Sequence, residues 1–152
     1  EKHSEDIENI GPEELGQLVV NFVKRIINTF GFVTEIYPDS AESVLIRGIR
    51  KALAESEMGD IPVRNSVKIE INDRIFALSL LTAQNRFFYT EYCNTLLEAL
   101  GTAIWDPKQI KKVRLDNGTS DIDTLDAFEY TYERYIKRLL PTVKTSNEDD
   151  GW

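Results

Sequence analysis

The chain has few of the residues on which many catalytic and metal sites depend. It contains one cysteine, Cys93, so an internal disulfide and a cysteine-rich zinc site are both excluded. Its one histidine, His3, lies near a polar end, which argues against a Ser-His-Asp triad and a histidine metal site. No G-x-x-x-x-G-K-[ST] loop occurs, so the sequence gives no sign of a site for nucleotide phosphates.

Long apolar runs are absent as well. No stretch approaches the ~20 apolar residues that cross a bilayer, and the acidic, polar start does not resemble a signal peptide. We therefore expect no membrane partner and a cytoplasmic location. Cys93 is then expected to be a small buried residue in a reducing compartment.

Acidic residues outnumber basic ones, and the net charge is -8. The two ends carry this charge, because six acids face one lysine in residues 1–14 and three acids lie in residues 148–150. Residues 15–147 are therefore neutral, which neither supports nor forbids a nucleic-acid partner and disfavours an acidic mimic of DNA. A local basic stretch is formed by Lys108, Lys111, Lys112 and Arg114, and it could also be a solvated loop.

Helical and extended patterns alternate along the chain. Apolar spacing predicts a helix at 15–30, begun by residues 11–14 and ended by Gly31. Further helices are expected at 41–54, 67–81, 91–104 and 122–140, and strands at 32–37 and 86–90. Shorter extended pieces are expected at 61–64 and 112–115. The alternation predicts an α/β sheet with helices on its faces, without an internal domain boundary.

Two acidic positions are candidates for chemistry. Asp39 follows a predicted strand and precedes a helix, where open α/β sheets bind ligands, although it could simply form a turn or cap. Asp123 and Asp126 are three residues apart and share one helix face. A divalent cation would relieve their repulsion, and oxygen ligands suit Mg²⁺ or Mn²⁺. Alternatively, these acids complement the helix N-terminus, with Ser120 or Asp121 as its cap.

Two segments together resemble the large subunit of phage terminases. Residues 36–43, I-Y-P-D-S-A-E-S, resemble the strand and D-S-A-E segment of that family. Residues 125–130, L-D-A-F-E-Y, resemble its closing [NH]-x-x-D-A-x-[RE]-Y helix, and residues 71–75 and 86–89 fit the same order of helix and strand. The resemblance extends from about Leu18 to Ile136.

The resemblance implies a ribonuclease H-like nuclease fold, truncated at the N-terminus, with a central, mostly parallel sheet flanked by helices. Residues 1–144 would be a partial terminase nuclease domain, and residues 145–152 a disordered acidic tail. Such a module is a hydrolase that cuts double-stranded DNA during genome packaging in the host cytoplasm. Its partners would be DNA, the terminase ATPase domain and other packaging proteins, and a homo-oligomer is expected if sheet edges are exposed.

The resemblance also implies roles for individual residues. Asp39 looks like the second acid of the metal cluster, Asp123 stands where relatives place a histidine or acid, and Asp126 matches the closing aspartate. Asp121 could assist them in holding two Mg²⁺ or Mn²⁺ ions, which would activate water and stabilise the leaving oxygen. The basic residues Lys108, Lys111, Lys112 and Arg114 would hold the DNA backbone.

The family's first metal-binding acid would precede the first helix and is not expected in this chain. We therefore expect weak or absent nuclease activity. The alternative is a non-catalytic α/β protein-interaction module of phage or bacterial origin. In that case the apolar segment 87–89 would be an exposed edge for a partner or a second copy, whereas otherwise it is a buried core strand.

Overall fold

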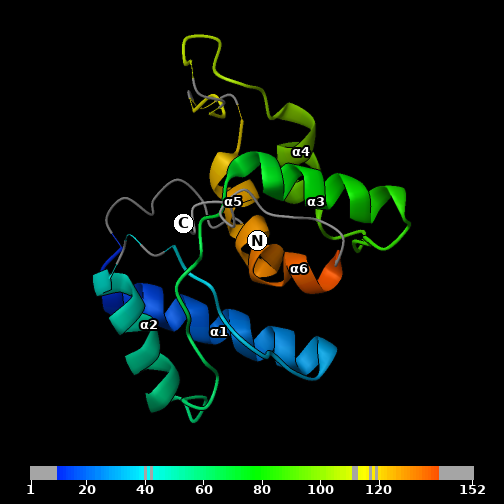
Figure 1. Cartoon of the computed structure of the whole chain (residues 1–152). Coiled ribbons are helices and arrows are strands. Elements are labelled where there is room, and N and C mark those ends of the chain that lie inside the picture. The colour runs from blue at the N-terminus through cyan, green and yellow to red at the C-terminus, as the bar shows by residue number, and fades with distance from the viewer. Residues whose placement is uncertain are drawn as a thin grey trace, which may run out of the picture. The chain divides into compact units, whose positions relative to one another are not determined.

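The computed structural model describes residues 10–39, 41, 43–110, 113–116, 118 and 120–140. In chain order these residues form α1 (Pro12–Phe30), α2 (Ser43–Glu55), α3 (Ile71–Ala83), α4 (Asn94–Thr102), α5 (Ile122–Tyr132), the 3-10 helix η2 (Glu133–Tyr135) and α6 (Ile136–Leu139) (Figure 1). Contacts divide the described chain into two compact units. We call residues 10–66 the N-terminal unit and residues 67–140 the C-terminal unit.

The predicted ribonuclease H-like fold, with a central, mostly parallel sheet flanked by helices, is wrong. The described residues are mostly helical and contain no sheet; their β pairing consists of two isolated bridges, Ile36 with Val63 and Trp105 with Arg114. The segments expected as strands are extended but unpaired over most of their length. Phe32 is 71% exposed and Phe88 is 80% exposed, so neither segment is the buried strand that a central sheet requires.

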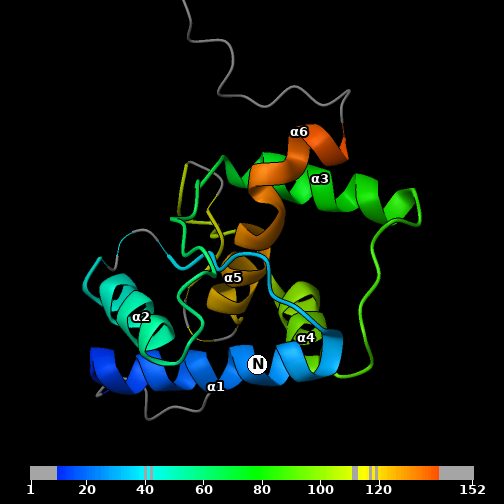
Figure 2. The ribbon, with the colours of Figure 1, turned by 90° about the horizontal axis from the view of Figure 1, so that it is seen from below.

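The N-terminal unit is built on the packing of α1 against α2, which lie side by side in Figure 2. Both helices have an apolar stripe at helical spacing, and the residues buried between them and the following segment are Val20, Val23, Ile46, Ile49, Leu53, Met58 and Val63. Local signals set the ends of α1 as predicted. Pro12 occupies its first turn, and Gly31 ends it with φ 94°, a left-handed conformation that favours glycine.

The segment before Asp39 runs beside residues 62–66 of the same unit. Ile36 donates its N–H to Pro62 O at 2.9 Å, and Arg64 donates back to Ile36 O at 2.9 Å. Ser66 donates to Pro38 O at 3.2 Å, so the pairing continues to the residue before Asp39. Because Pro62 has no N–H, the pairing is limited to this short stretch.

The C-terminal unit packs α3 against the last helices. Its buried apolar residues are Ile69, Ala77, Leu81, Tyr132, Ile136 and Leu140. The predicted helix 122–140 is interrupted at η2, where Glu133 turns its carboxylate inward and accepts the N–H groups of Val67, Lys68 and Ile69. Lys68 has φ 56°, which is not helical, and α3 therefore begins at Ile71, later than predicted.

Two further expectations concern the surface. Cys93 is half-buried at the N-cap of α4, with its sulfur 3.4 Å from Thr90 Oγ1, so it is less enclosed than expected. Within the described helices, none combines the length and apolarity that would be needed to span a membrane. The predicted domain range 1–144 stays a prediction, and the tail at 145–152 lies outside the described residues.

Candidate functional site: an acid-lined pocket beside helix α5

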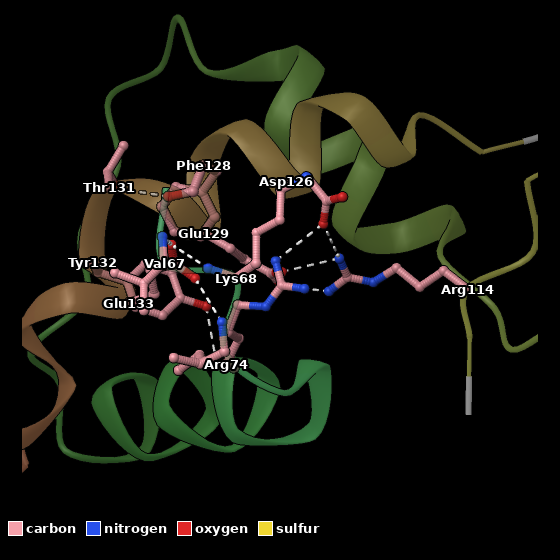
Figure 3. A network of polar contacts seen from close by, with 11 residues as sticks. Val67, Lys68, Arg74, Arg114, Asp126, Phe128, Glu129, Thr131, Tyr132 and Glu133 are labelled. Atoms are coloured by element: carbon pink, nitrogen blue, oxygen red, sulfur yellow. Dashed lines mark hydrogen bonds and ion pairs between the residues drawn. The ribbon is translucent and has the colours of Figure 1, made fainter. Parts of the chain in front are cut away.

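Four charged side chains, three of them buried and Asp126 partly exposed, form a network in the C-terminal unit (Figure 3). Arg74 of α3 places Nη1 3.1 Å from Asp126 Oδ1 and 2.9 Å from Glu129 Oε2. Arg114 places Nη1 3.1 Å from Glu129 Oε2 and 3.4 Å from Asp126 Oδ1, and its Nη2 bonds Glu129 Oε1. Two residues of α5 thus hold two arginines that come from different parts of the chain.

The network is neutral in sum, as its burial requires. Glu129 is 1% exposed and Arg114 is 7% exposed, so each charge would be costly without its partners. Tyr132 donates its hydroxyl to Arg74 O at 2.9 Å. Burial, and next the negative charge of Glu129, raise the pKa of the Tyr132 hydroxyl well above its ordinary range. Tyr132 is therefore a neutral hydrogen-bond donor here and does not act as a base.

The N-terminal end of α5 borders an open pocket of about 470 Å³. Its lining includes four carboxylates, those of Glu98, Asp116, Asp121 and Asp123, which makes the pocket strongly acidic. The remaining lining residues are Thr95, Thr102, Gly118, Ser120 and Ile122. We call this hollow the acid-lined pocket.

Asp121 and Asp123 differ in how they are held. Asp121 is the N-cap of α5, and its carboxylate accepts the N–H of Thr124 at 3.2 Å and the Thr124 hydroxyl at 2.8 Å. Asp123 lies in the first turn and is exposed. The cap role that the sequence left open for Asp121 is therefore confirmed, while Asp123 presents its carboxylate to solvent beside it.

The donor chemistry of the pocket suits a hard divalent cation. Carboxylate and hydroxyl oxygens are the ligands of Mg²⁺, which keeps several waters and is often bound by only one or two carboxylates. In the part of the chain that the structure describes, no three acid, histidine or cysteine side chains are grouped closely enough to hold one ion. The pocket therefore offers oxygen donors of the right kind, but no grouped set of three such ligands among the described residues.

The other predicted acids are placed differently. Asp39 belongs to the N-terminal unit, is exposed, and accepts the N–H of Ala41 at 2.8 Å, which is a turn-forming contact. Asp126 shares α5 with Asp123, but its carboxylate pairs with Arg74 and Arg114. Of the predicted acids, the structure brings Asp121 and Asp123 to one pocket.

The predicted basic stretch is also divided. Lys108 is exposed, and its N–H bonds Asp106 Oδ1 at 2.9 Å. Arg114 is buried in the network, where its guanidinium is turned to α5 and bonds Asp126 and Glu129. Lys111 and Lys112 lie outside the described residues. Of the predicted basic residues that the structure describes, Lys108 is the exposed one, and its contact with DNA stays a prediction.

Two acids of the pocket were not predicted. Asp116 belongs to the Asp116-Asn117-Gly118 sequence, which indicates a turn and nothing about a ligand. Glu98 lies on α4, and a single exposed acid on a helix gives no sequence signal. Their position in the pocket depends on how α4 and the segment before α5 pack, which the sequence pattern does not specify.

An apolar hollow of about 320 Å³ lies elsewhere in the C-terminal unit. Its lining comes from α3, α4, α5 and the segment after α4, and consists of Ile75, Leu78, Ser79, Leu100, Ala103, Ile104, Trp105, Arg114, Leu125 and Glu129. In the same unit, Phe88 is 80% exposed on the extended segment after α3, and Tyr92 is 85% exposed in the turn that follows it. The lining of this hollow is more apolar than that of the acid-lined pocket.

Comparison with known proteins adds no assignment to these features. No protein-family model, no curated protein and no solved structure matches the chain.

Proposed function

We propose that this chain belongs to a metal-dependent endonuclease module of a phage DNA-packaging terminase, and that Asp121 and Asp123 are its metal-facing acids. The observation that supports the proposal is that both residues, which lie just before the segment 125–130 that resembles the family's closing motif, line one open pocket with Asp116 and Glu98. The resemblance of residues 36–43 supports the same family. The pocket's oxygen donors suit the Mg²⁺ or Mn²⁺ that such chemistry uses.

The residues of the pocket have separable roles in this proposal. A bound divalent ion would lower the pKa of a water molecule and offset negative charge on the phosphodiester. Asp123, which is exposed, presents its carboxylate to the ion, and Asp121 is fixed beside it by Thr124. Asp126, paired with two arginines, fixes the position of α5. Lys108, which is exposed, is suited to a contact with the DNA backbone.

The proposal is tested by cleavage of supercoiled plasmid DNA at high protein concentration, in Mn²⁺, in Mg²⁺ and in EDTA. We expect weak nicking in Mn²⁺ that Asp123→Asn removes. Asp60→Asn, which changes an exposed acid in the N-terminal unit, serves as the control and should leave the nicking unchanged. Nicking that survives EDTA or Asp123→Asn would contradict the proposal.

A second candidate function is protein interaction, specifically self-association through the segment 86–92. The observation that favours it is the exposure of Phe88 and Tyr89 on the extended residues 86–90, which have no strand partner among the described residues, and of Tyr92 in the turn that follows. An extended segment of this kind can pair with the same segment of a second copy, and that pairing would cover its aromatic side chains.

Sedimentation velocity of the wild-type protein tests the second candidate function, self-association. Self-association predicts a dimer that Phe88→Ser converts to a monomer, while Phe30→Ser, which removes a phenylalanine 60% exposed at the end of α1, has no effect. A wild-type monomer at high protein concentration would rule out this second function.

A further inference from the structure

We infer that the C-terminal unit binds a single strand of nucleic acid at its α6 end. The binding surface consists of four exposed cations and two exposed aromatic side chains, which are Arg86, Phe88, Tyr89, Arg134, Lys137 and Arg138. We call it the basic surface. The inference goes beyond the proposed function, because none of these residues lines the acid-lined pocket.

Two segments that are distant in the sequence meet at the basic surface. Arg86, in the segment after α3, donates from Nη1 to Leu139 O at 2.7 Å and to Gln84 Oε1 at 3.1 Å. The first of these hydrogen bonds satisfies a carbonyl at the end of α6. It also places the Arg86 guanidinium beside the last turn of that helix, which includes Lys137 and Arg138.

Both segments contain cations and no acids. Residues 75–90 have one charged side chain, that of Arg86, and residues 134–140 have three, which are those of Arg134, Lys137 and Arg138. The three are spaced three or four residues apart, so they extend from one side of η2 and α6. In a chain of net charge -8, two adjoining segments with this composition are suited to an anionic partner.

Two of the cations have no acidic partner inside the unit. Among the described residues, no carboxylate pairs with Arg86 or Arg138. Glu133, which precedes Arg134, is 4% exposed, and its carboxylate accepts the N–H groups of residues 67–69. The acid that is nearest in sequence is therefore held inside the unit and leaves the charge of the basic surface in place.

The aromatic side chains after Arg86 favour single-stranded nucleic acid over an acidic protein. Phe88 is 80% exposed and Tyr89 is 54% exposed, two and three residues after Arg86 on the extended segment. Sites for single strands combine cations that contact phosphates with aromatic rings on which unpaired bases stack. An acidic peptide would use the cations alone, and in a duplex the bases are already stacked on one another.

The inference is tested by fluorescence anisotropy of labelled oligothymidine with the full chain, in EDTA and at several salt concentrations. Four phosphate contacts on a single strand predict a slope of about -3 for log affinity against log salt concentration. Arg138→Gln should lower the affinity about fivefold and make this slope less steep by about 0.7. Arg138→Lys, which keeps the charge, should retain the slope.

Arg47→Gln is the matched control, because it removes an exposed cation of α2 in the N-terminal unit. It should leave the affinity within about twofold of wild type. Phe88→Ser tests the stacking role separately, at a protein concentration where sedimentation velocity shows the same species for the variant and the wild type. It should lower the affinity at least about fivefold without changing the salt slope.

Three results with DNA would overturn the inference: no binding of oligothymidine at low salt, equal effects of Arg138→Gln and Arg47→Gln, or tighter binding of a duplex of the same length. Binding of phosphatidylserine vesicles in place of oligothymidine would assign the surface to a membrane and overturn it as well. Because the titration contains EDTA, binding there supports the inference even if nicking fails. Nicking in Mn²⁺ together with an affinity that Arg138→Gln leaves unchanged would retain the proposed function alone.

Discussion

At the scale of single residues, Glu129 is the most deeply buried charge of the network in the C-terminal unit. Its carboxylate is 1% exposed and is shared by Arg74 and Arg114. Glu129→Gln would leave two buried guanidinium groups with only Asp126 to balance them. We expect a loss of about 3–5 kcal/mol in the free energy of unfolding, measured with urea.

Glu98→Gln is the control for this substitution, because it makes the same chemical change at an exposed residue of the same unit. It should alter the free energy of unfolding by less than about 0.5 kcal/mol. Equal effects of the two substitutions would show that the buried network does not stabilise the unit.

The raised pKa of Tyr132 predicts how the free energy of unfolding depends on pH in the alkaline range. Burial and the Glu129 carboxylate raise the pKa of its hydroxyl, whereas in the unfolded chain the hydroxyl ionises near its ordinary pKa of about 10. The folded state then holds a proton that the unfolded state releases, so stability falls as the pH rises above about 10, by roughly 1 kcal/mol per pH unit. Below that pH the contribution is fully present.

Tyr132→Phe should remove this part of the alkaline dependence. Because it also removes the hydrogen bond to Arg74 O, it should cost about 1 kcal/mol at neutral pH. Urea unfolding at pH values on both sides of about 10 measures both effects. An alkaline slope that is the same in both proteins would contradict the raised pKa of Tyr132.

The acids of α5 show which parts of the candidate site could be predicted from the sequence. Spacing placed Asp123 and Asp126 on one helix face, but Asp126 is taken by Arg74, 52 residues away, and by Arg114, 12 residues away. Pairing between such distant residues depends on the packing of α3 and of the segment 113–116, which no local pattern encodes. The cap role of Asp121, in contrast, is local and was among the predicted alternatives.

At the scale of elements, helices were predicted better than strands for a physical reason. Helical hydrogen bonds are local, so the pattern at 12–30 and its glycine stop suffice to define α1. A strand needs a partner, and the aromatic segment 86–90 has β-forming composition but no neighbour among the described residues. The break at η2 was missed because it depends on Glu133 reaching the N–H groups of residues 67–69.

Because α1 and α2 approach closely at Gly16, adding one methyl group at this position should destabilise the N-terminal unit. A Cβ at Gly16 would lie 2.8 Å from the Cβ of Ala52 and 3.1 Å from the carbonyl oxygen of Gly48, so the helices would have to separate. We expect Gly16→Ala to lower the free energy of unfolding of the N-terminal unit by about 1–3 kcal/mol.

Gly101→Ala is the matched control within a helix. A Cβ there would meet nothing within 4 Å, and the substitution should stabilise α4 by up to about 1 kcal/mol. Thermal unfolding of both variants measures the difference. If Gly16→Ala is as stable as the wild type, the close approach of α1 and α2 is contradicted.

At the scale of the whole molecule, the two halves of the terminase resemblance fall in different units. Asp39 and its D-S-A-E segment belong to the N-terminal unit, while Asp121, Asp123 and Asp126 belong to the C-terminal unit. Each unit has its own apolar core. The proposed metal site therefore lies in the C-terminal unit, where the lining of the acid-lined pocket does not include Asp39.

The most direct test of that claim is a Mn²⁺ binding isotherm, followed by the electron paramagnetic resonance signal of the free ion in the absence of DNA. We predict saturable binding to the wild-type chain that Asp123→Asn weakens at least about tenfold and that Asp60→Asn leaves unchanged. A wild-type chain that takes up no Mn²⁺ at millimolar concentration, or an affinity indifferent to Asp123→Asn, would contradict it.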